Sequence, residues 1–155
     1  MNVFSRDGKF EGERKGAYWT VYADSRGRQY KAQLFGVKNG IVSRSDRGSS
    51  QAATFAAIGP VAPGWELAEV RLAGLDASDN VYVKTTEAIH EKLRFGRLLR
   101  FDPSGKKTGE LAIARSMEYF STLPRFYRVT PSGDVLTFAT HEQLGYSISK
   151  VTFPR

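Results

Sequence analysis

The segment FDPSGKKTGE, residues 101–110, repeats a pattern that the chain has already used in FSRDGKFEGE, residues 4–13. The two segments align without a gap, so that Gly8 matches Gly105 and each glycine is followed by a lysine. A glycine at a fixed position of a short polar segment is typical of a tight turn between two β-strands. A chain that contains the same turn twice is predicted to be a repeat protein.

A second type of turn alternates with the first. Each copy lies between strand-like segments rich in aromatic and β-branched residues, which is typical of a β-hairpin. The hairpins are residues 20–37, 75–85 and 126–140. In order along the chain, the aligned positions are Asp24, Gly27 and Tyr30, then Asp76, Asp79 and Tyr82, then Thr130, Gly133 and Leu136. A weaker copy of the first type lies around Gly48. The glycines Gly8, Gly27, Gly105 and Gly133 are predicted to be structural turn residues, because glycine adopts positive φ without strain.

The alternation predicts an all-β fold, an antiparallel meander in one domain of about three repeating units. The units cover approximately residues 1–50, 51–110 and 111–155. A period of roughly 40–55 residues with four short strands per unit is typical of β-propeller blades. Because one blade cannot bury both faces of its sheet, we expect neighbouring units to stack.

The segments LDASDNVYV, LLRFDPSGKKTGEL and RVTPSGDVLTF resemble the alternation of strands and turns in NHL-like bacterial β-propellers. The resemblance covers most of residues 1–153 and is clearest in residues 75–140. It implies a fold but not a function, since propellers serve as enzymes, lectins and scaffolds. A ring needs at least about four blades. The resemblance therefore implies an incomplete or permuted ring: a piece of a larger propeller, a ring completed by another chain or copy, or an open structure whose last strand pairs with the first.

Three segments are less regular. Residues 85–96 fit a helical turn, with Ile89 and Leu93 at the spacing of one helix face. Residues 110–123 fit either a helix or a strand followed by a loop, and the repeat favours the strand. Residues 50–67 predict a strand followed by a connection that prolines and a glycine interrupt.

The composition excludes several classes of protein. The chain has no cysteine, which excludes disulfides, thiolate metal sites and cysteine nucleophiles. No apolar run approaches the ~18 residues of a membrane helix, so we expect no membrane insertion. The N-terminal sequence MNVFSRDGKFEGERKG lacks the apolar core of a signal peptide. We therefore expect a cytoplasmic protein, or an exported domain whose leader has been removed.

No catalytic or metal-binding motif is recognisable. His90 and His141 are far apart and have no partner at metal-ligand spacing. His90 is interpreted as a solvated polar residue, and His141 as a loop residue that follows a strand. The segment SGKKTGE, residues 104–110, shares only a Gly-Lys pair with phosphate-binding loops, and its simplest interpretation is a hairpin turn. The segment DASDN, residues 76–80, lacks the acidic ladder of a calcium loop. We expect no enzyme, no metal and no cofactor.

The basic residues point to anionic partners. There are 23 Lys and Arg against 16 Asp and Glu, a net charge of +7, which favours nucleic acid, a membrane surface or an acidic protein face. Cations beside aromatic residues are typical of single-strand nucleic-acid binders, and equally of half-buried strands whose aromatics form the core. The candidate macromolecule-binding residues are Arg94, Arg97, Arg100, Lys106, Lys107, Arg125 and Arg128.

The sequence thus predicts a non-enzymatic binding or scaffold module of β-propeller type, which engages a protein or completes a ring by self-association. The alternative is a nucleic-acid-binding basic β domain, for which strongly salt-dependent affinity would be diagnostic. Under either hypothesis, replacing Arg94, Arg97 and Arg100 together is expected to weaken partner binding and leave the fold intact.

Overall fold

The computed structural model describes residues 2–4, 10–13, 21–89, 93–116, 126–141 and 145–153. Within these residues the regular structure consists of thirteen β-strands, all paired antiparallel with their neighbours. This confirms the all-β class that the sequence predicts. In the same part of the chain there is no helix with the length and apolar character that crossing a membrane requires.

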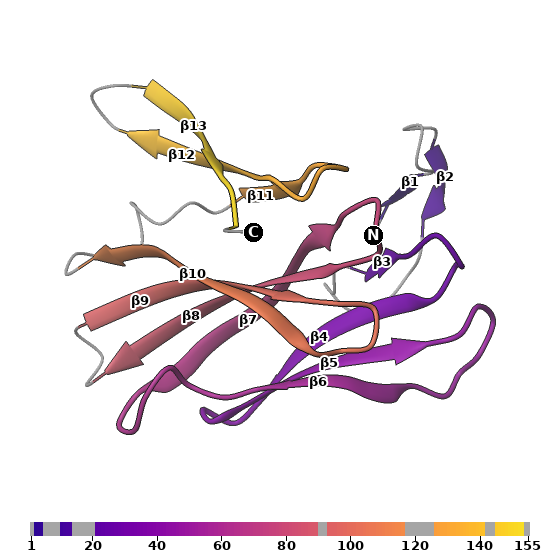
Figure 1. Cartoon of the computed structure of the whole chain (residues 1–155), viewed down its shortest axis with the longest axis horizontal. Coiled ribbons are helices and arrows are strands. Elements are labelled where there is room, and N and C mark those ends of the chain that lie inside the picture. The colour runs from indigo at the N-terminus through magenta and orange to yellow at the C-terminus, as the bar shows by residue number, and fades with distance from the viewer. Residues whose placement is uncertain are drawn as a thin grey trace.

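The strands form four sheets in sequence order (Figure 1). A two-stranded sheet pairs β1 (Asn2–Phe4) with β2 (Phe10–Glu13). Sheet I consists of β3 (Val21–Ala23), β4 (Gln29–Phe35), β5 (Asn39–Ser45) and β6 (Ala53–Ile58). Sheet II consists of β7 (Glu66–Leu75), β8 (Val81–Ile89), β9 (Leu93–Phe101) and β10 (Lys107–Ser116). Sheet III consists of β11 (Phe126–Val129), β12 (Val135–His141) and β13 (Gly145–Val151).

Sheets I, II and III stack face to face, with sheet II in the middle (Figure 1). One hydrophobic cluster, which includes Tyr30 and Val83, lies between sheets I and II. A second cluster, which includes Tyr82 and Val135, lies between sheets II and III. The core is therefore divided into two layers, and each layer is shared by two consecutive sheets.

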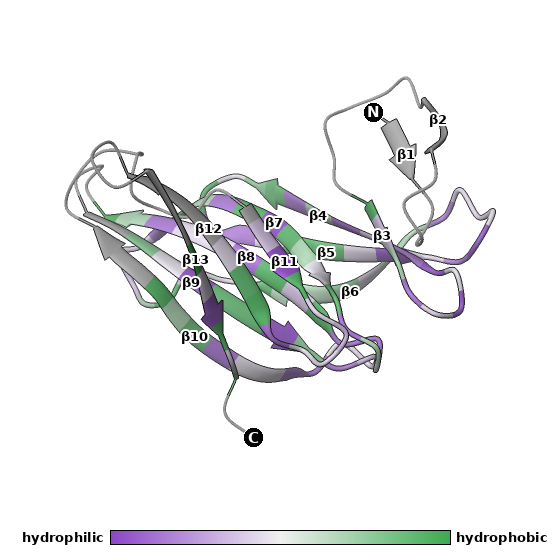
Figure 2. Cartoon of the chain, turned by 90° about the horizontal axis from the view of Figure 1, so that it is seen from above, coloured by the Kyte–Doolittle hydropathy of each residue, from purple (hydrophilic) through white to green (hydrophobic). Residues whose placement is uncertain are grey.

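The central strand β8 shows the effect of this arrangement. A strand with one solvent face would alternate between buried and exposed residues. In β8, residues 81–87 are buried without interruption, although they include Lys84 and Glu87. Both hydrophobic and hydrophilic residues occur along the strands (Figure 2), and in β8 the polar side chains are enclosed together with the apolar ones.

The first strands of the three sheets, β3, β7 and β11, lie beside one another. Close approach of β7 and β11 depends on Gly74, which follows an irregularity in the pairing of β7 with β8 and has φ +151°. A Cβ atom at this position would lie 2.9 Å from Cγ2 of Val129 in β11. Glycine is therefore required at this position both by the backbone and by the neighbouring strand.

The observed strands test several secondary-structure predictions made from the sequence. All three predicted hairpins are present, and residues 50–67 contain β6 followed by a connection. A helical turn over residues 85–96 is wrong, because Ile89 of β8 pairs with Leu93 of β9. The threonines and valines of β8 favour a strand that is covered on both faces, and this preference outweighs the weak helical spacing.

The outer strand β10 confirms the strand interpretation of residues 110–115. The boundaries of the sheets differ from those of the expected repeating units. Sheet I covers residues 21–58, and sheet II covers residues 66–116. His141 is the last residue of β12 and not a loop residue, and His90 lies outside the described residues.

Candidate interaction surface

Four hairpin turns, β3–β4, β7–β8, β9–β10 and β11–β12, share one hydrogen-bond pattern. In the turns that begin at Asp24, Asp76 and Asp102, the first carboxylate accepts hydrogen bonds from the backbone N–H groups two and four residues later, at 2.9–3.1 Å. In sheet III the Thr130 hydroxyl accepts the hydrogen bond from the Asp134 N–H at 3.1 Å. These local bonds compensate the backbone groups that the turn removes from the strand ladder.

The fourth residue of each turn has positive φ. The angles are 75° at Gly27, 61° at Asp79, 93° at Gly105 and 83° at Gly133. Its N–H donates to the carbonyl of the first residue at 2.9–3.1 Å. The turns around residues 4–13 and 101–110 are both hairpins, β1–β2 and β9–β10, while Gly8 itself lies outside the described residues.

Two of the turn aspartates also hold a tyrosine. The Tyr30 hydroxyl donates to Asp24 at 3.0 Å, and the Tyr82 hydroxyl donates to Asp76 at 2.9 Å. Burial, together with the hydrogen bond to Asp76, raises the pKa of Tyr82 to about 12. Burial would raise the pKa of Asp24, but hydrogen bonds from Arg28, Tyr30 and Arg26 outweigh it and hold the pKa below its ordinary value.

The carboxylates of these turns are engaged by hydrogen bonds within the turns themselves. Each oxygen of Asp24 and Asp76 already accepts hydrogen bonds from the protein. Across the described ranges, no group of three or more His, Asp or Glu side chains is arranged to hold a metal ion. The hydrogen bonds of Asp24 and Asp76 thus close the turns in which these residues lie.

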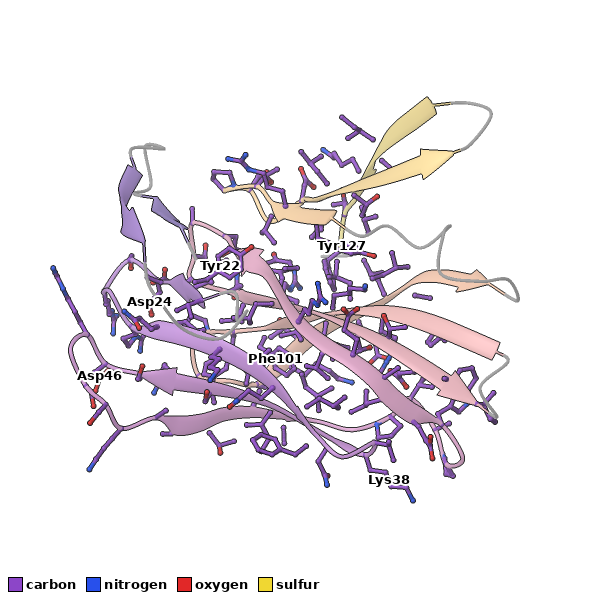
Figure 3. All side chains as sticks on the ribbon, turned by 180° about the vertical axis from the view of Figure 1, so that it is seen from behind. Tyr22, Asp24, Lys38, Asp46, Phe101 and Tyr127 are labelled. Carbon is purple, nitrogen blue, oxygen red and sulfur yellow. The ribbon has the colours of Figure 1, made fainter. Side chains whose placement is uncertain are left out.

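Neighbouring turns are connected across the stack. The backbone N–H and hydroxyl of Ser25 donate to the carboxylate of Asp79 at 2.9 and 2.6 Å, which joins sheet I to sheet II. The N–H of Ala77 donates to the carbonyl of Pro131 at 3.0 Å, which joins sheet II to sheet III. Figure 3 shows Asp24 and Asp46 at this end of the strands and Lys38 at the opposite end.

Arg97, one of the predicted binding residues, is enclosed and not on the surface. Its side chain is 6% exposed and lies 2.5 Å from Oε1 of the fully buried Glu87. Further bonds run from its guanidinium to Glu110 at 3.1 Å and to the carbonyl of Gly59 at 2.7 Å. Glu87 in turn accepts the N–H of Val61 at 2.6 Å. Arg97 therefore cannot contact a macromolecule, and its replacement is not expected to leave the fold intact.

The other predicted cations that the structure describes differ in their burial and in their contacts. Arg100 is half-buried, with its guanidinium 5.1 Å from the centre of the Phe153 ring. Lys107 forms an ion pair with Glu110 at 2.6 Å, and Lys106 is exposed in the same turn. Arg128 is exposed on sheet III. Arg125 and the side chain of Arg94 lie outside the described residues.

Strand pairing identifies corresponding positions on the three sheets. In each sheet, the sixth residue after the start of the first turn is paired with a cation of the next strand. The pairs are Tyr30 with Arg44 in sheet I, Tyr82 with Arg100 in sheet II, and Leu136 with Lys150 in sheet III. In sheets I and II, these pairs lie on the face that points toward the next sheet in sequence.

The next sheet covers this face in sheets I and II. Arg44 donates to the carbonyl of Pro103 in sheet II at 3.3 Å, and Tyr82 is in edge contact with Phe153, which follows β13, at 5.5 Å between ring centres. On sheet III the corresponding face points outward, and Ile148 is 65% exposed on it. This open face is the candidate interaction surface.

The sequence predicted the alignment of Leu136 with Tyr30 and Tyr82, but not that this position of sheet III would be left open. Reasoning from basic residues also missed Ile148, which has no charge to mark it. No protein-family model matches the chain, and no curated protein matches it.

Proposed function

We propose that the chain is a non-enzymatic binding module built from propeller-type blades, and that it engages another protein through the outward face of sheet III. The observation that carries the proposal is the 65% exposure of Ile148 on a face whose counterparts in sheets I and II are covered. The terminal unit of a stack of repeats normally has a polar outer face, so an exposed isoleucine on that face favours a contact with another protein.

The propeller interpretation has four supports. Sheets I and II each have four antiparallel strands, the sheets stack in sequence order, and their first strands lie side by side. The same turn recurs at the same place in each sheet. These features are typical of blades, in which each unit buries its faces only against its neighbours.

The acidic and basic groups favour binding over catalysis. Asp24, Asp76 and Glu87 are engaged by turn backbones or by a buried guanidinium. Lys84 pairs with Glu69 at 2.7 Å and lies 5.4 Å from the centre of the Tyr127 ring. A catalytic acid or base needs a polar atom within reach of a substrate, and these groups already serve structural contacts.

Site-specific photo-crosslinking tests the proposal. A benzoylphenylalanine at position 148, introduced in cells that produce the protein, is expected to give a covalent adduct with a protein. The matched control places the same probe at position 35, since Phe35 is also apolar and 52% exposed but lies on sheet I. Equal labelling from both positions, or no protein adduct at position 148, contradicts the proposal.

Titration with nucleic acid tests the alternative. A labelled single-stranded oligonucleotide is mixed with the purified chain at about 50 and about 200 mM salt. Because the described cations are dispersed or paired, we expect weak binding at both concentrations. Tight binding that weakens steeply with salt would instead favour the basic β domain.

A further inference from the structure

The two ends of the stacked strands differ in polarity. One end carries the aspartate turns described above. The other end carries the tip of the β4–β5 hairpin, residues 36–38, and the connection between β6 and β7, residues 59–65 (Figure 1, Figure 3). Of the five large apolar residues found exposed in the described part of the chain, three lie here: Phe35 is 52% exposed, Val37 47% and Val61 38%. We call these two loops, together with Phe35, the apolar end.

The two loops of the apolar end are both bonded to sheet II. The carbonyl of Val37 accepts the N–H of Leu67 at 2.6 Å, just after the connection. The N–H of Val61 donates to the buried carboxylate of Glu87 at 2.6 Å. The exposed valines are therefore held side by side on the same support. Exposed apolar residues gathered in one place mark a contact with a protein or with a membrane.

Much of the backbone of these loops is already hydrogen-bonded or has no donor. Besides the two bonds above, the carbonyl of Gly59 accepts from the guanidinium of Arg97 at 2.7 Å, and the N–H of Trp65 donates to the carbonyl of Ala62 at 3.2 Å. The two prolines of the connection have no N–H. Lipid cannot supply hydrogen bonds to a backbone that leaves water, whereas a protein partner can. This backbone is thus suited to a lipid contact.

The charges favour an anionic surface on this side. Lys38 is exposed at the tip of the hairpin, and a lysine beside apolar residues can extend its ammonium group to lipid phosphates. Every aspartate that the structure describes lies in a turn at the opposite end, and in those turns aspartates outnumber lysines and arginines. Because the whole chain carries a net charge of +7, an anionic bilayer attracts it, and this distribution turns the Lys38 tip toward the lipid.

We propose that the apolar end is a membrane-docking surface, which inserts Phe35, Val37 and Val61 into the interfacial region of a bilayer that contains anionic lipids. The contact is shallow and involves no membrane-spanning segment, since the exposed Glu66 follows the connection directly. The inference goes beyond the proposed function, because it concerns a different surface from the open face of sheet III.

Sedimentation with lipid vesicles tests the nature of the partner. The purified chain is mixed with vesicles of phosphatidylcholine that contain roughly 30% phosphatidylserine, and with vesicles of phosphatidylcholine alone. We expect the chain to sediment with the anionic vesicles. Binding to the neutral vesicles is expected to be at least about fivefold weaker, because the attraction between the basic chain and the anionic lipid is lost.

A pair of matched variants tests the surface. Val61→Glu is expected to weaken binding to the anionic vesicles at least about tenfold, because a charge replaces an apolar side chain that enters the interface. The control is Val21→Glu, since Val21 is also 38% exposed but begins β3, next to the Asp24 turn. The added charge is the same in both variants, so a difference between them depends on its position.

A fluorescence measurement does not depend on how well the glutamate variants fold. Since the chain has no cysteine, a nitrobenzoxadiazole dye can be attached to Val37→Cys and, in a separate sample, to Val21→Cys. When anionic vesicles are added, the emission of the dye at position 37 is expected to shift to shorter wavelength as the dye leaves water. The dye at position 21 is expected to show no shift.

The other outcomes overturn the inference. Absence of binding to anionic vesicles excludes the membrane contact, and equal binding to neutral vesicles excludes the role of anionic lipid. An equal loss from both glutamate variants would mean that net charge and not the apolar end holds the chain on the bilayer. If vesicles are not bound and a benzoylphenylalanine at position 61 crosslinks to a protein in cells, the apolar end is a protein contact. None of these results bears on position 148, so the proposed function is tested separately.

Discussion

At the scale of single residues, the buried ion pair between Arg97 and Glu87 is expected to contribute strongly to the stability of the fold. Arg97→Met keeps the length of the side chain but leaves the fully buried Glu87 carboxylate without its cation. We expect the free energy of unfolding in urea to fall by about 3–5 kcal/mol, because an uncompensated buried charge is costly.

Arg128→Met is the matched control, because Arg128 is exposed on sheet III. Its effect on the free energy of unfolding is expected to stay within about 0.5 kcal/mol. If both substitutions cost the same, the enclosed ion pair does not contribute to stability. Sequence reasoning assigned both arginines to macromolecule binding. The comparison distinguishes the buried Arg97 from the exposed Arg128 by their effects on stability.

Single residues show why part of the fold was predictable. The Asp-x-x-Gly turns depend on hydrogen bonds between residues at most four positions apart, as in Asp102 with Ser104 and Lys106. The same residues form the turn wherever it lies in the chain. Arg97 could not be placed in this way, since its burial depends on Glu87 and on the carbonyl of Gly59, far away in the sequence.

At the scale of elements, the contact between β7 and β11 depends on Gly74. Gly74→Ala would place Cβ 2.9 Å from Cγ2 of Val129 and would impose a side chain at φ +151°. We expect a loss of about 2–3 kcal/mol in the free energy of unfolding, because both the backbone and the packing of sheet III on sheet II are strained. Urea-induced unfolding followed by tyrosine and tryptophan fluorescence measures it.

Gly59→Ala provides the comparison, because a Cβ at Gly59 would meet nothing within 4 Å. Its expected effect on stability is within about 0.5 kcal/mol. A loss from Gly74→Ala no larger than this would mean that β7 and β11 adjust to the methyl group, so their spacing would not be set by glycine.

Elements also show where sequence reasoning fails. Residues 85–96 pointed to a helical turn, because a strand buried on both faces loses the alternation that identifies strands. The strand in residues 110–115 was favoured over a helix only because the repeat required an outer strand there, and β10 contains these residues. The open face of sheet III could not be predicted from the sequence. It is recognised only by comparison with the equivalent faces of sheets I and II, which the next sheet covers.

At the scale of the whole molecule, carboxylates in all three stacked sheets make the fold sensitive to acid. Burial opposes ionisation of Asp24, Glu69 and Glu110, but hydrogen bonds and nearby cations outweigh it and hold their pKa values below the ordinary ones. The hydrogen bond from Lys150 likewise lowers the pKa of Asp134. Each group therefore binds a proton more readily in the unfolded chain than in the folded one.

Stability from these groups is complete above the unfolded pKa values, 4.5 for Glu and 3.8 for Asp, and is lost as the pH falls through the lower folded values. We expect the urea midpoint to be constant between about pH 6 and 7 and to decrease steadily below about pH 4.5. Asp24→Asn should lower the midpoint at pH 7 and make the decrease in acid shallower, because one titrating group is removed. A variant with the same acid slope as the natural chain would show that Asp24 is not part of the linkage, and the remaining carboxylates would have to account for it.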